Sequence, residues 1–129
     1  NANEKNNMIK TKSEIDENIN KKKFTVLDAR SRNRFLGLEA EPRPWVKSGS
    51  IDGSKSLPLN ELINTKDNTF LDKEKLKNIF SLRGVNNNEI VMSCGSSVSA
   101  SSLALAYSII NDDYMAKIYI GSWTEYGKR

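Results

Sequence analysis

The single cysteine of this 129-residue chain stands where a thiol can be made chemically active. Cys94 ends the short apolar run 90–93 and is followed by three small residues, 95–97, after which residues 98–110 have helical periodicity. This order predicts a strand, a tight loop and a helix. The N–H groups of such a loop and the start of the helix stabilise an anion, and the thiolate is the nucleophilic form of cysteine. The pattern therefore makes Cys94 a candidate nucleophile.

A second interpretation of the same residue stays open at this point. Most lone cysteines are small buried apolar residues, and Cys94 follows an apolar strand pattern. One cysteine excludes a disulfide within the chain and fits a reducing compartment. We therefore expect an intracellular location, cytoplasmic or mitochondrial, and no targeting segment is visible in a sequence that does not begin with Met.

Strand and helix patterns alternate along the chain and must position this cysteine. A parallel sheet with helices on both faces, an α/β fold, is the architecture that such alternation predicts. Asp28 ends a predicted strand, and Cys94 and Gly121 each follow one, so these residues should meet at the carboxyl edge of the sheet. The expected elements are a helix at 13–19 capped by Ser13, a strand at 24–28, helical turns at 30–37, a long loop at 38–56, helical turns after Pro58, a helix capped by Asp72 that runs through Phe80 and stops before Gly84, a strand at 90–93, a helix at 98–110 and a strand at 116–120.

Composition excludes several classes of function. A length of 129 residues is enough for one domain with its own core. The net charge of +4 comes from interspersed charges, so we expect no nucleic-acid partner, and no apolar run is long enough to span a membrane. The chain has no histidine, which excludes cysteine–histidine protease chemistry and zinc sites with histidine ligands. We expect no metal and no cofactor.

Four stretches together resemble a known family. Residues 94–99 read Cys-Gly-Ser-Ser-Val-Ser, and 28–37 contain Asp-Ala-Arg followed by Arg-Phe and Gly. Residues 41–54 begin Glu-Pro-Arg-Pro, and 121–127 read Gly-Ser-Trp-Thr-Glu-Tyr-Gly. In this order they resemble the rhodanese-like sulfurtransferases, in the version found in the C-terminal catalytic domain of 3-mercaptopyruvate sulfurtransferases.

The resemblance implies an architecture. It covers about residues 24–129, which we expect to form a rhodanese-like catalytic domain with a central parallel five-stranded sheet and helices on both faces. Residues 1–23 are then a polar segment with a short helix, either leading into the domain or part of it. Such domains follow an N-terminal rhodanese-like domain in the same protein, which is therefore an expected partner.

The resemblance also implies a reaction. Cys94 would take sulfur from a small-molecule donor, 3-mercaptopyruvate, as a persulfide and pass it to a thiol or cyanide acceptor. Arg34 and Arg43 match the arginines that bind the donor's carboxylate and keto oxygen, a task that suits a guanidinium fork. Ser96 is the one member of the family's proposed serine–histidine–aspartate relay that this chain retains. The remaining loop positions expected to contact the donor are Gly95, Ser97, Val98 and Ser99.

One residue of the Cys94 loop departs from the family pattern, and three matched residues outside the loop are expected to have no chemical role. Ser97 stands where the family has glycine, and a serine would be strained there if the loop requires a positive φ. Asp28 and Arg30 are expected to pair with each other and to be structural, and Trp123 to be a core or wall residue.

The same residues allow three other functions to be compared with this one. Cysteine phosphatases clamp phosphate with an arginine at the position that Ala100 occupies here, so phosphatase activity is disfavoured. A thiosulfate sulfurtransferase remains an alternative, although the residues that follow Cys94 are neutral and do not match a dianion. A non-catalytic sulfur-carrier or regulatory rhodanese module also remains open.

Overall fold

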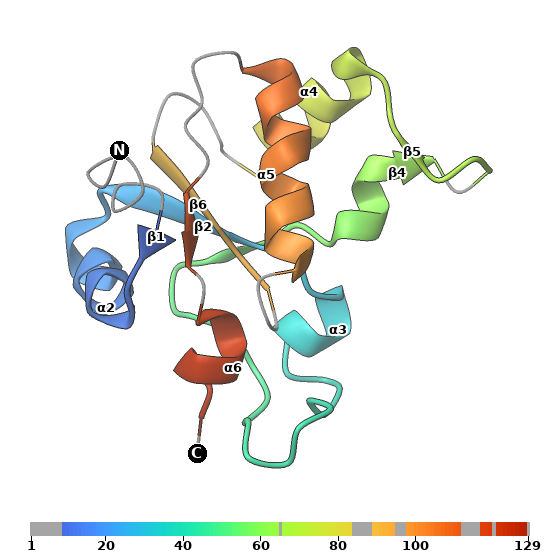
Figure 1. Cartoon of the computed structure of the whole chain (residues 1–129). Coiled ribbons are helices and arrows are strands. Elements are labelled where there is room, and N and C mark those ends of the chain that lie inside the picture. Colours follow the sequence, from blue (N-terminus) through green and yellow to red (C-terminus); the bar gives the residue numbers. More distant parts are fainter. Residues whose placement is uncertain are drawn as a thin grey trace.

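A computed structural model describes residues 9–64, 66–83, 89–94, 98–111, 117–119 and 121–128. Helices and strands alternate through most of this part of the chain (Figure 1). In chain order the elements are β1 (Ile9–Lys10), α2 (Lys12–Lys21), β2 (Phe24–Asp28), α3 (Arg32–Phe35), β3 (Lys55–Ser56), the 3-10 helix η1 (Leu59–Leu62), β4 (Ile63–Asn64), β5 (Thr69–Phe70), α4 (Lys73–Leu82), β6 (Glu89–Ser93), α5 (Val98–Ile110), β7 (Ile118–Tyr119) and α6 (Ser122–Tyr126).

The main sheet has five strands in the order β1-β7-β6-β2-β3, and every neighbouring pair is parallel. The longest pairing joins β2 and β6 over five residues each, from Phe24 opposite Glu89 to Asp28 opposite Ser93. The predicted five-stranded parallel sheet is therefore confirmed. Because the strands are parallel, Asp28, Ser56 and Ser93 end their strands at the same edge.

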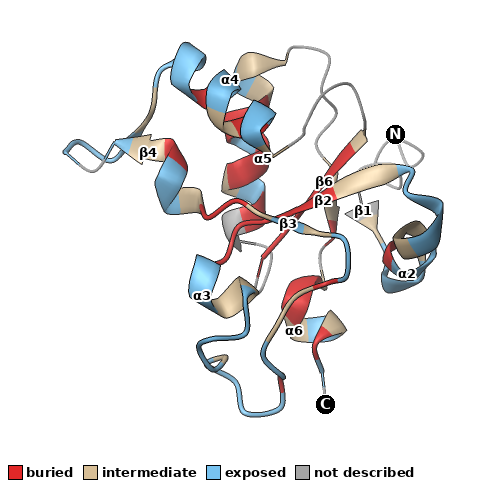
Figure 2. Ribbon diagram, turned by 180° about the vertical axis from the view of Figure 1, so that it is seen from behind, coloured by how far each residue is buried: buried red, intermediate tan, exposed pale blue. Residues whose placement is uncertain are grey.

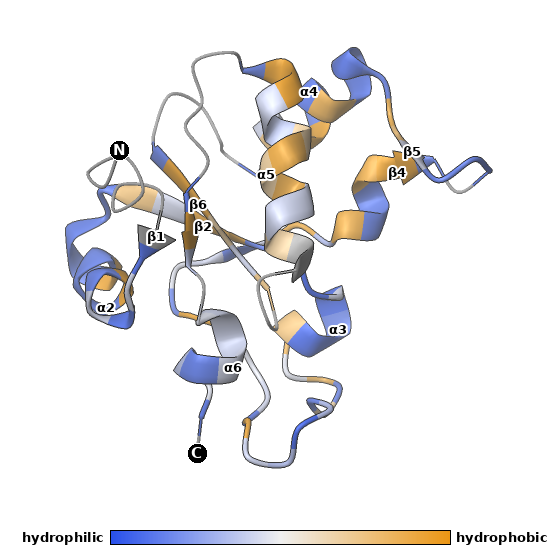
Figure 3. Cartoon of the chain, in the orientation of Figure 1, coloured by the Kyte–Doolittle hydropathy of each residue, from blue (hydrophilic) through white to orange (hydrophobic). Residues whose placement is uncertain are grey.

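Side-chain alternation along the two central strands builds a core on each face of the sheet. Leu27 and Met92 face a cluster formed with α4, α5 and η1, whereas Val26 and Val91 face one formed with α2 and α6. Figure 1 shows α4 and α5 on one side of the sheet and α2 on the other. β2 and β6 carry much of the buried surface (Figure 2), and the hydropathy colouring of α5 contrasts with the largely hydrophilic α2 (Figure 3).

The amino-terminal elements differ from the expectation. α2 begins after Thr11, not at Ser13: the Thr11 side chain accepts from the Glu14 N–H, and Glu14 in turn accepts from the Thr11 N–H at 3.1 Å. This capping box stabilises a start one half-turn earlier. β1 pairs with β7 at residues 9–10, for which no strand was predicted.

The segment after Pro58 is also more regular than its pattern indicated. The expected helical turns form only the short η1, and the chain then makes an antiparallel hairpin of β4 and β5. Asp72 caps α4 by accepting from the Lys75 N–H at 3.0 Å, as predicted. α5 spans residues 98–110, which confirms the predicted helix.

Candidate active site

The carboxyl end of β6 delivers Cys94 to the start of α5. Cys94 is 2% exposed, and it follows four buried residues of the strand. α5 begins at Val98 and runs for 13 residues. Cys94 therefore lies between the carboxyl end of β6 and the amino end of α5, at the edge where parallel α/β sheets bind ligands. The predicted roles of Gly95, Ser96 and Ser97 lie outside the described residues, as do those of the side chains of Val98 and Ser99.

The main chain of Cys94 is held from the beginning of α6. The Cys94 N–H donates to the Ser122 hydroxyl at 3.1 Å, and the Trp123 N–H donates to the Cys94 carbonyl at 2.8 Å. Sequence reasoning placed the neighbouring Gly121 at this edge of the sheet but gave Ser122 no role. The sequence did contain a signal, because Ser122 lies in one of the matched stretches and comes one residue after Gly121, which directly follows a predicted strand.

A buried ion pair lies at the carboxyl end of β2. Arg30 Nη2 lies 2.7 Å from Asp28 Oδ2, and its Nη2 also donates to the Gly49 carbonyl at 2.7 Å. The guanidinium carbon lies 5.0 Å from the Trp123 ring centroid, which is cation–π geometry. Both charged residues are almost fully buried, so the predicted pairing of Asp28 with Arg30 and the core position of Trp123 are confirmed.

Arg34 makes a second ion pair that the sequence did not indicate. Its Nε and Nη2 donate to Oε2 and Oε1 of Glu41 at 2.7 and 2.8 Å, a two-bond fork. The Glu41 side chain is 4% exposed, and Arg30 Nη1 approaches its Oε2 at 3.4 Å. Burial acts to raise the pKa of the Glu41 carboxyl, but the hydrogen bond from Arg34 and the charges of Arg30 and Arg34 outweigh it, so the pKa lies below its usual value.

These contacts connect the cysteine to the long loop. The Cys94 carbonyl binds the Trp123 N–H, the Trp123 ring lies beneath Arg30, and Arg30 reaches Glu41, which holds Arg34. The structure thus links one predicted donor-binding arginine to Cys94 through buried groups. It does so through Glu41, a residue that sequence reasoning left unassigned.

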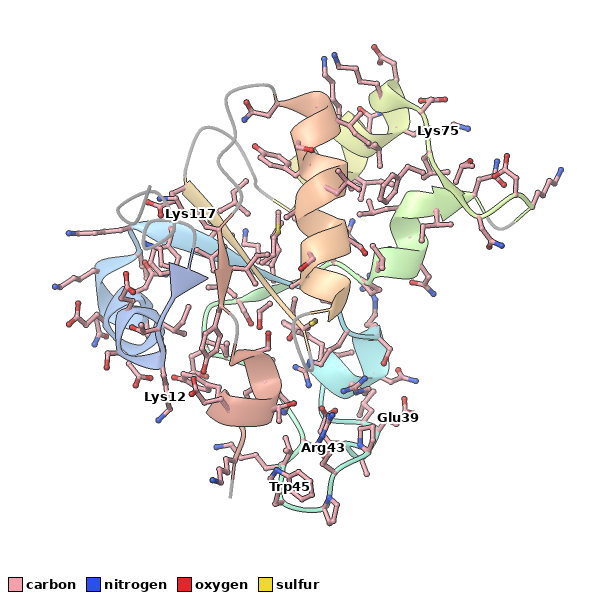
Figure 4. The ribbon with its side chains drawn as sticks, viewed as in Figure 1. Lys12, Glu39, Arg43, Trp45, Lys75 and Lys117 are labelled. Carbon is pink, nitrogen blue, oxygen red and sulfur yellow. The ribbon has the colours of Figure 1, made fainter. Side chains whose placement is uncertain are left out.

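Arg43 has a different environment from Arg34. It lies on the exposed part of the long loop, with Glu39 and Trp45 nearby at the same end of the molecule (Figure 4). Within the described residues no ion pair or hydrogen bond involves its guanidinium. The loop is anchored just beyond it, since Lys47 N–H donates to the Gly127 carbonyl at 2.8 Å. The guanidinium of Arg43 is thus accessible on an anchored loop.

Apolar side chains are exposed on the same loop. Leu36 is 57% exposed, Leu38 74% and Trp45 50%. Exposed large apolar residues gathered on one segment mark interaction surfaces more often than scattered ones do. Among the described residues no group of three potential ligands could hold a metal ion, and no helix is long and apolar enough to cross a membrane.

Comparisons with known proteins agree on one family. The sequence model of the rhodanese-like domain matches residues 11–129. Human 3-mercaptopyruvate sulfurtransferase is 35% identical over 125 residues, which are 94% of this chain and 40% of the relative. Mouse thiosulfate sulfurtransferase is 32% identical over 124 residues, 95% of this chain and 41% of the relative. The crystal structure of Tum1 from Saccharomyces cerevisiae superposes with a TM-score of 0.82 at 28% identity, covering 95% of this chain and 44% of that one. The chain thus spans about 40% of the length of the curated relatives it matches.

Proposed function

Because the chain belongs to the rhodanese-like domain family, we propose that it is the sulfur-accepting domain of a sulfurtransferase that uses 3-mercaptopyruvate as donor. The relatives named for sulfurtransferase activity support the reaction class. The match of several relatives named 3-mercaptopyruvate sulfurtransferase supports the donor. Cys94 is the sulfur acceptor in this proposal.

The proposed reaction has two transfers. The Cys94 thiolate attacks the sulfur of 3-mercaptopyruvate, an S–S bond forms and the donor's C–S bond breaks. The electron pair of that bond goes to carbon as the enolate of pyruvate, which takes up a proton. A thiolate or cyanide then attacks the outer sulfur of the persulfide, and the Cys94 thiolate leaves in its original state.

One observation carries the proposal: the chain's only cysteine lies between the carboxyl end of β6 and the amino end of α5. Ligands of parallel α/β sheets bind at this edge. Cys94 is also buried in the core cluster on the α4–α5 face of the sheet, so its place at this edge, rather than its packing, supports a reactive thiol.

The contacts of the two candidate arginines support unequal roles in donor binding. Arg34 already uses Nε and Nη2 on Glu41, so within the described contacts Nη1 is the terminal nitrogen left for a ligand. Arg43 is exposed and has its whole fork available. We propose that Arg43 makes the two-bond contact with the donor carboxylate and that Arg34 adds a single bond to the keto oxygen.

A second domain of the full-length protein completes the proposal. The relatives are longer than the matched region by more than half of their own length. The exposed apolar residues Leu36, Leu38 and Trp45 lie on the loop that carries Arg43, and they support contact with that domain beside the site. Turnover by this chain alone should accordingly be lower than by the full-length protein.

Intact-mass measurement tests the sulfur acceptor directly. Incubation with 3-mercaptopyruvate should add the mass of one sulfur atom to the chain, and dithiothreitol should remove it. Cys94→Ser should not gain the mass. If Cys94→Ser gains it, the acceptor is another group and the proposal is wrong.

Competition between donors tests the choice of substrate. Mercaptopyruvate should give a higher specificity constant than thiosulfate in the sulfide-release or thiocyanate assay, because no basic residue directly follows Cys94. A higher constant for thiosulfate would assign the chain to the alternative activity. Persulfide formation without turnover in the full-length protein would instead favour the sulfur-carrier module.

A further inference from the structure

We propose that Ser122 is a positioning residue for the thiol of Cys94, an inference that rests on the proposed function of that thiol. The Ser122 hydroxyl accepts from the Cys94 N–H at 3.1 Å and donates to the Tyr119 carbonyl at 2.8 Å. The next N–H along, that of Trp123, donates to the Cys94 carbonyl at 2.8 Å. Both peptide groups that flank the Cys94 α-carbon are thus fixed by residues 122–123.

The backbone of Ser122 is strained in a way that serves this contact. Ser122 is completely buried with φ +50°, in the left-handed region that glycine enters freely and other residues enter rarely. Strain of this kind persists only where the surrounding structure holds it. The turn brings both the hydroxyl of Ser122 and the N–H of Trp123 onto Cys94. A glycine would satisfy the turn, so the hydroxyl is the feature that requires another explanation.

The helix α6, which begins at Ser122, is held in place by hydrogen bonds to two other segments. The indole N–H of Trp123 donates to the Lys47 carbonyl at 2.8 Å, and the Tyr126 hydroxyl donates to Asp16 Oδ1 at 2.6 Å. Burial and this bond to Asp16 raise the pKa of Tyr126 to about 12, so the hydroxyl keeps its proton at neutral pH. α6 is therefore tied both to the long loop and to α2, and it can impose an orientation on Cys94.

The orientation of the Cys94 side chain matters because, in the proposed reaction, Sγ must lie close to the donor sulfur and to the amino end of α5 at the same time. A misplacement of about 1 Å at a reacting centre can cost about two decades in rate. Without the Ser122 hydroxyl, the Cys94 N–H loses this hydrogen bond, and we expect the residue to sample other orientations. One hydrogen bond of ordinary strength corresponds to a roughly two- to tenfold loss of the productive orientation.

Ser122→Ala and Ser122→Gly test the inference, with Ser54→Ala as the matched control. Ser54 also donates to a carbonyl, that of Ile51 at 2.6 Å, and no hydrogen bond within the described residues joins it to Cys94 or α6. The first measurement is the rate of Cys94 alkylation by iodoacetamide at neutral pH, followed by intact mass. The second is the rate of sulfur loading as a function of 3-mercaptopyruvate concentration.

Both Ser122 variants should alkylate about two- to tenfold more slowly at neutral pH. The maximal loading rate should fall by a similar factor while the half-saturating donor concentration stays unchanged. Ser122→Gly should melt at a higher temperature than Ser122→Ala, because glycine accepts the positive φ without strain. Ser54→Ala should match the wild-type chain in both rates.

Several results would overturn the inference. It is wrong if a folded Ser122 variant keeps both rates, or if Ser122→Gly regains the reactivity that Ser122→Ala loses, since backbone strain rather than the hydroxyl would then be responsible. It is also wrong if neither variant folds, since Ser122 would then be purely structural. Alkylation needs no sulfur donor, so a slowed alkylation in a chain that never forms a persulfide would retain the positioning role and refute the proposed function.

Discussion

Replacing Arg34 should affect stability as well as donor binding, because Arg34 is the main partner of a buried carboxylate. Arg34→Ala removes both bonds of the fork to Glu41 and leaves that carboxylate with Arg30 Nη1 at 3.4 Å. A buried charged group that loses a hydrogen-bonding partner costs about 1.5–3 kcal/mol. Arg34 itself is partly exposed, and Arg30 remains in place, so we expect the lower half of that range.

The expected change is large enough to measure by thermal unfolding. For a domain of this length, 1 kcal/mol corresponds to roughly 4 °C in melting temperature, so Arg34→Ala should melt about 6–9 °C below the wild-type chain. Arg43→Ala is the matched control, because Arg43 is exposed and makes no ion pair within the described residues. Its free energy of unfolding should change by less than about 0.5 kcal/mol.

A double-mutant cycle identifies the source of the loss. Glu41→Gln removes the charge that Arg34 compensates, so Arg34→Ala should cost less in the Glu41→Gln background than in the wild-type chain. The two single variants should therefore destabilise by more, in sum, than the double variant does. Equal melting temperatures for Arg34→Ala and Arg43→Ala, or strictly additive effects in the cycle, would refute the reasoning.

Three further outcomes are expected. The pKa of Glu41 is lowered in the folded chain, so the ionised carboxylate adds to the free energy of unfolding above the unfolded-state pKa of about 4.3. This stabilisation is lost as the pH falls through the pKa of the folded chain. Urea unfolding at several pH values should therefore show that the difference in free energy of unfolding between wild type and Arg34→Ala becomes smaller in acid. Arg43→Ala should raise the half-saturating concentration of 3-mercaptopyruvate by about one to two decades. Arg43→Lys should restore only part of the donor affinity, because an ammonium cannot make the two-bond contact. If Arg43→Ala leaves the half-saturating concentration unchanged, the donor carboxylate binds elsewhere. Gly127→Ala would put a Cβ 2.5 Å from Cε2 of Trp123, so it should destabilise the chain by about 1–3 kcal/mol in denaturant unfolding; a neutral result would mean that the ring has room to move.

The regular elements could be predicted wherever an element has its own periodic pattern. β2, β6, α4 and α5 each carry several consecutive apolar residues or a clear cap, and their positions agree with the sequence interpretation. β1 could not be found in this way. It has two residues, Ile9 and Lys10, and it exists through pairing with β7, more than 100 residues later. The β4–β5 hairpin is equally short and depends on its mutual pairing.

The candidate site was predictable to the extent that chemistry follows from local sequence. Cys94 could be singled out because strand, loop and helix patterns adjoin it. Glu41 could not, since a glutamate in a loop with two prolines is expected to be solvated, and only the folded loop encloses it between Arg30 and Arg34. Ser122 acts across 28 residues of chain, a separation that no periodicity reports.

The contacts between Cys94 and residues 122–123 also set an order of events during synthesis. A ribosome releases the strand–thiol segment before the residues that clamp it, and β1 must wait for residue 118 before it finds its neighbour in the sheet. Such long-range pairings form late, because the loops that close them carry a large entropy cost. A chain that ends before residue 121 would therefore lack the contacts that hold the Cys94 main chain, even though β6 and α5 are complete.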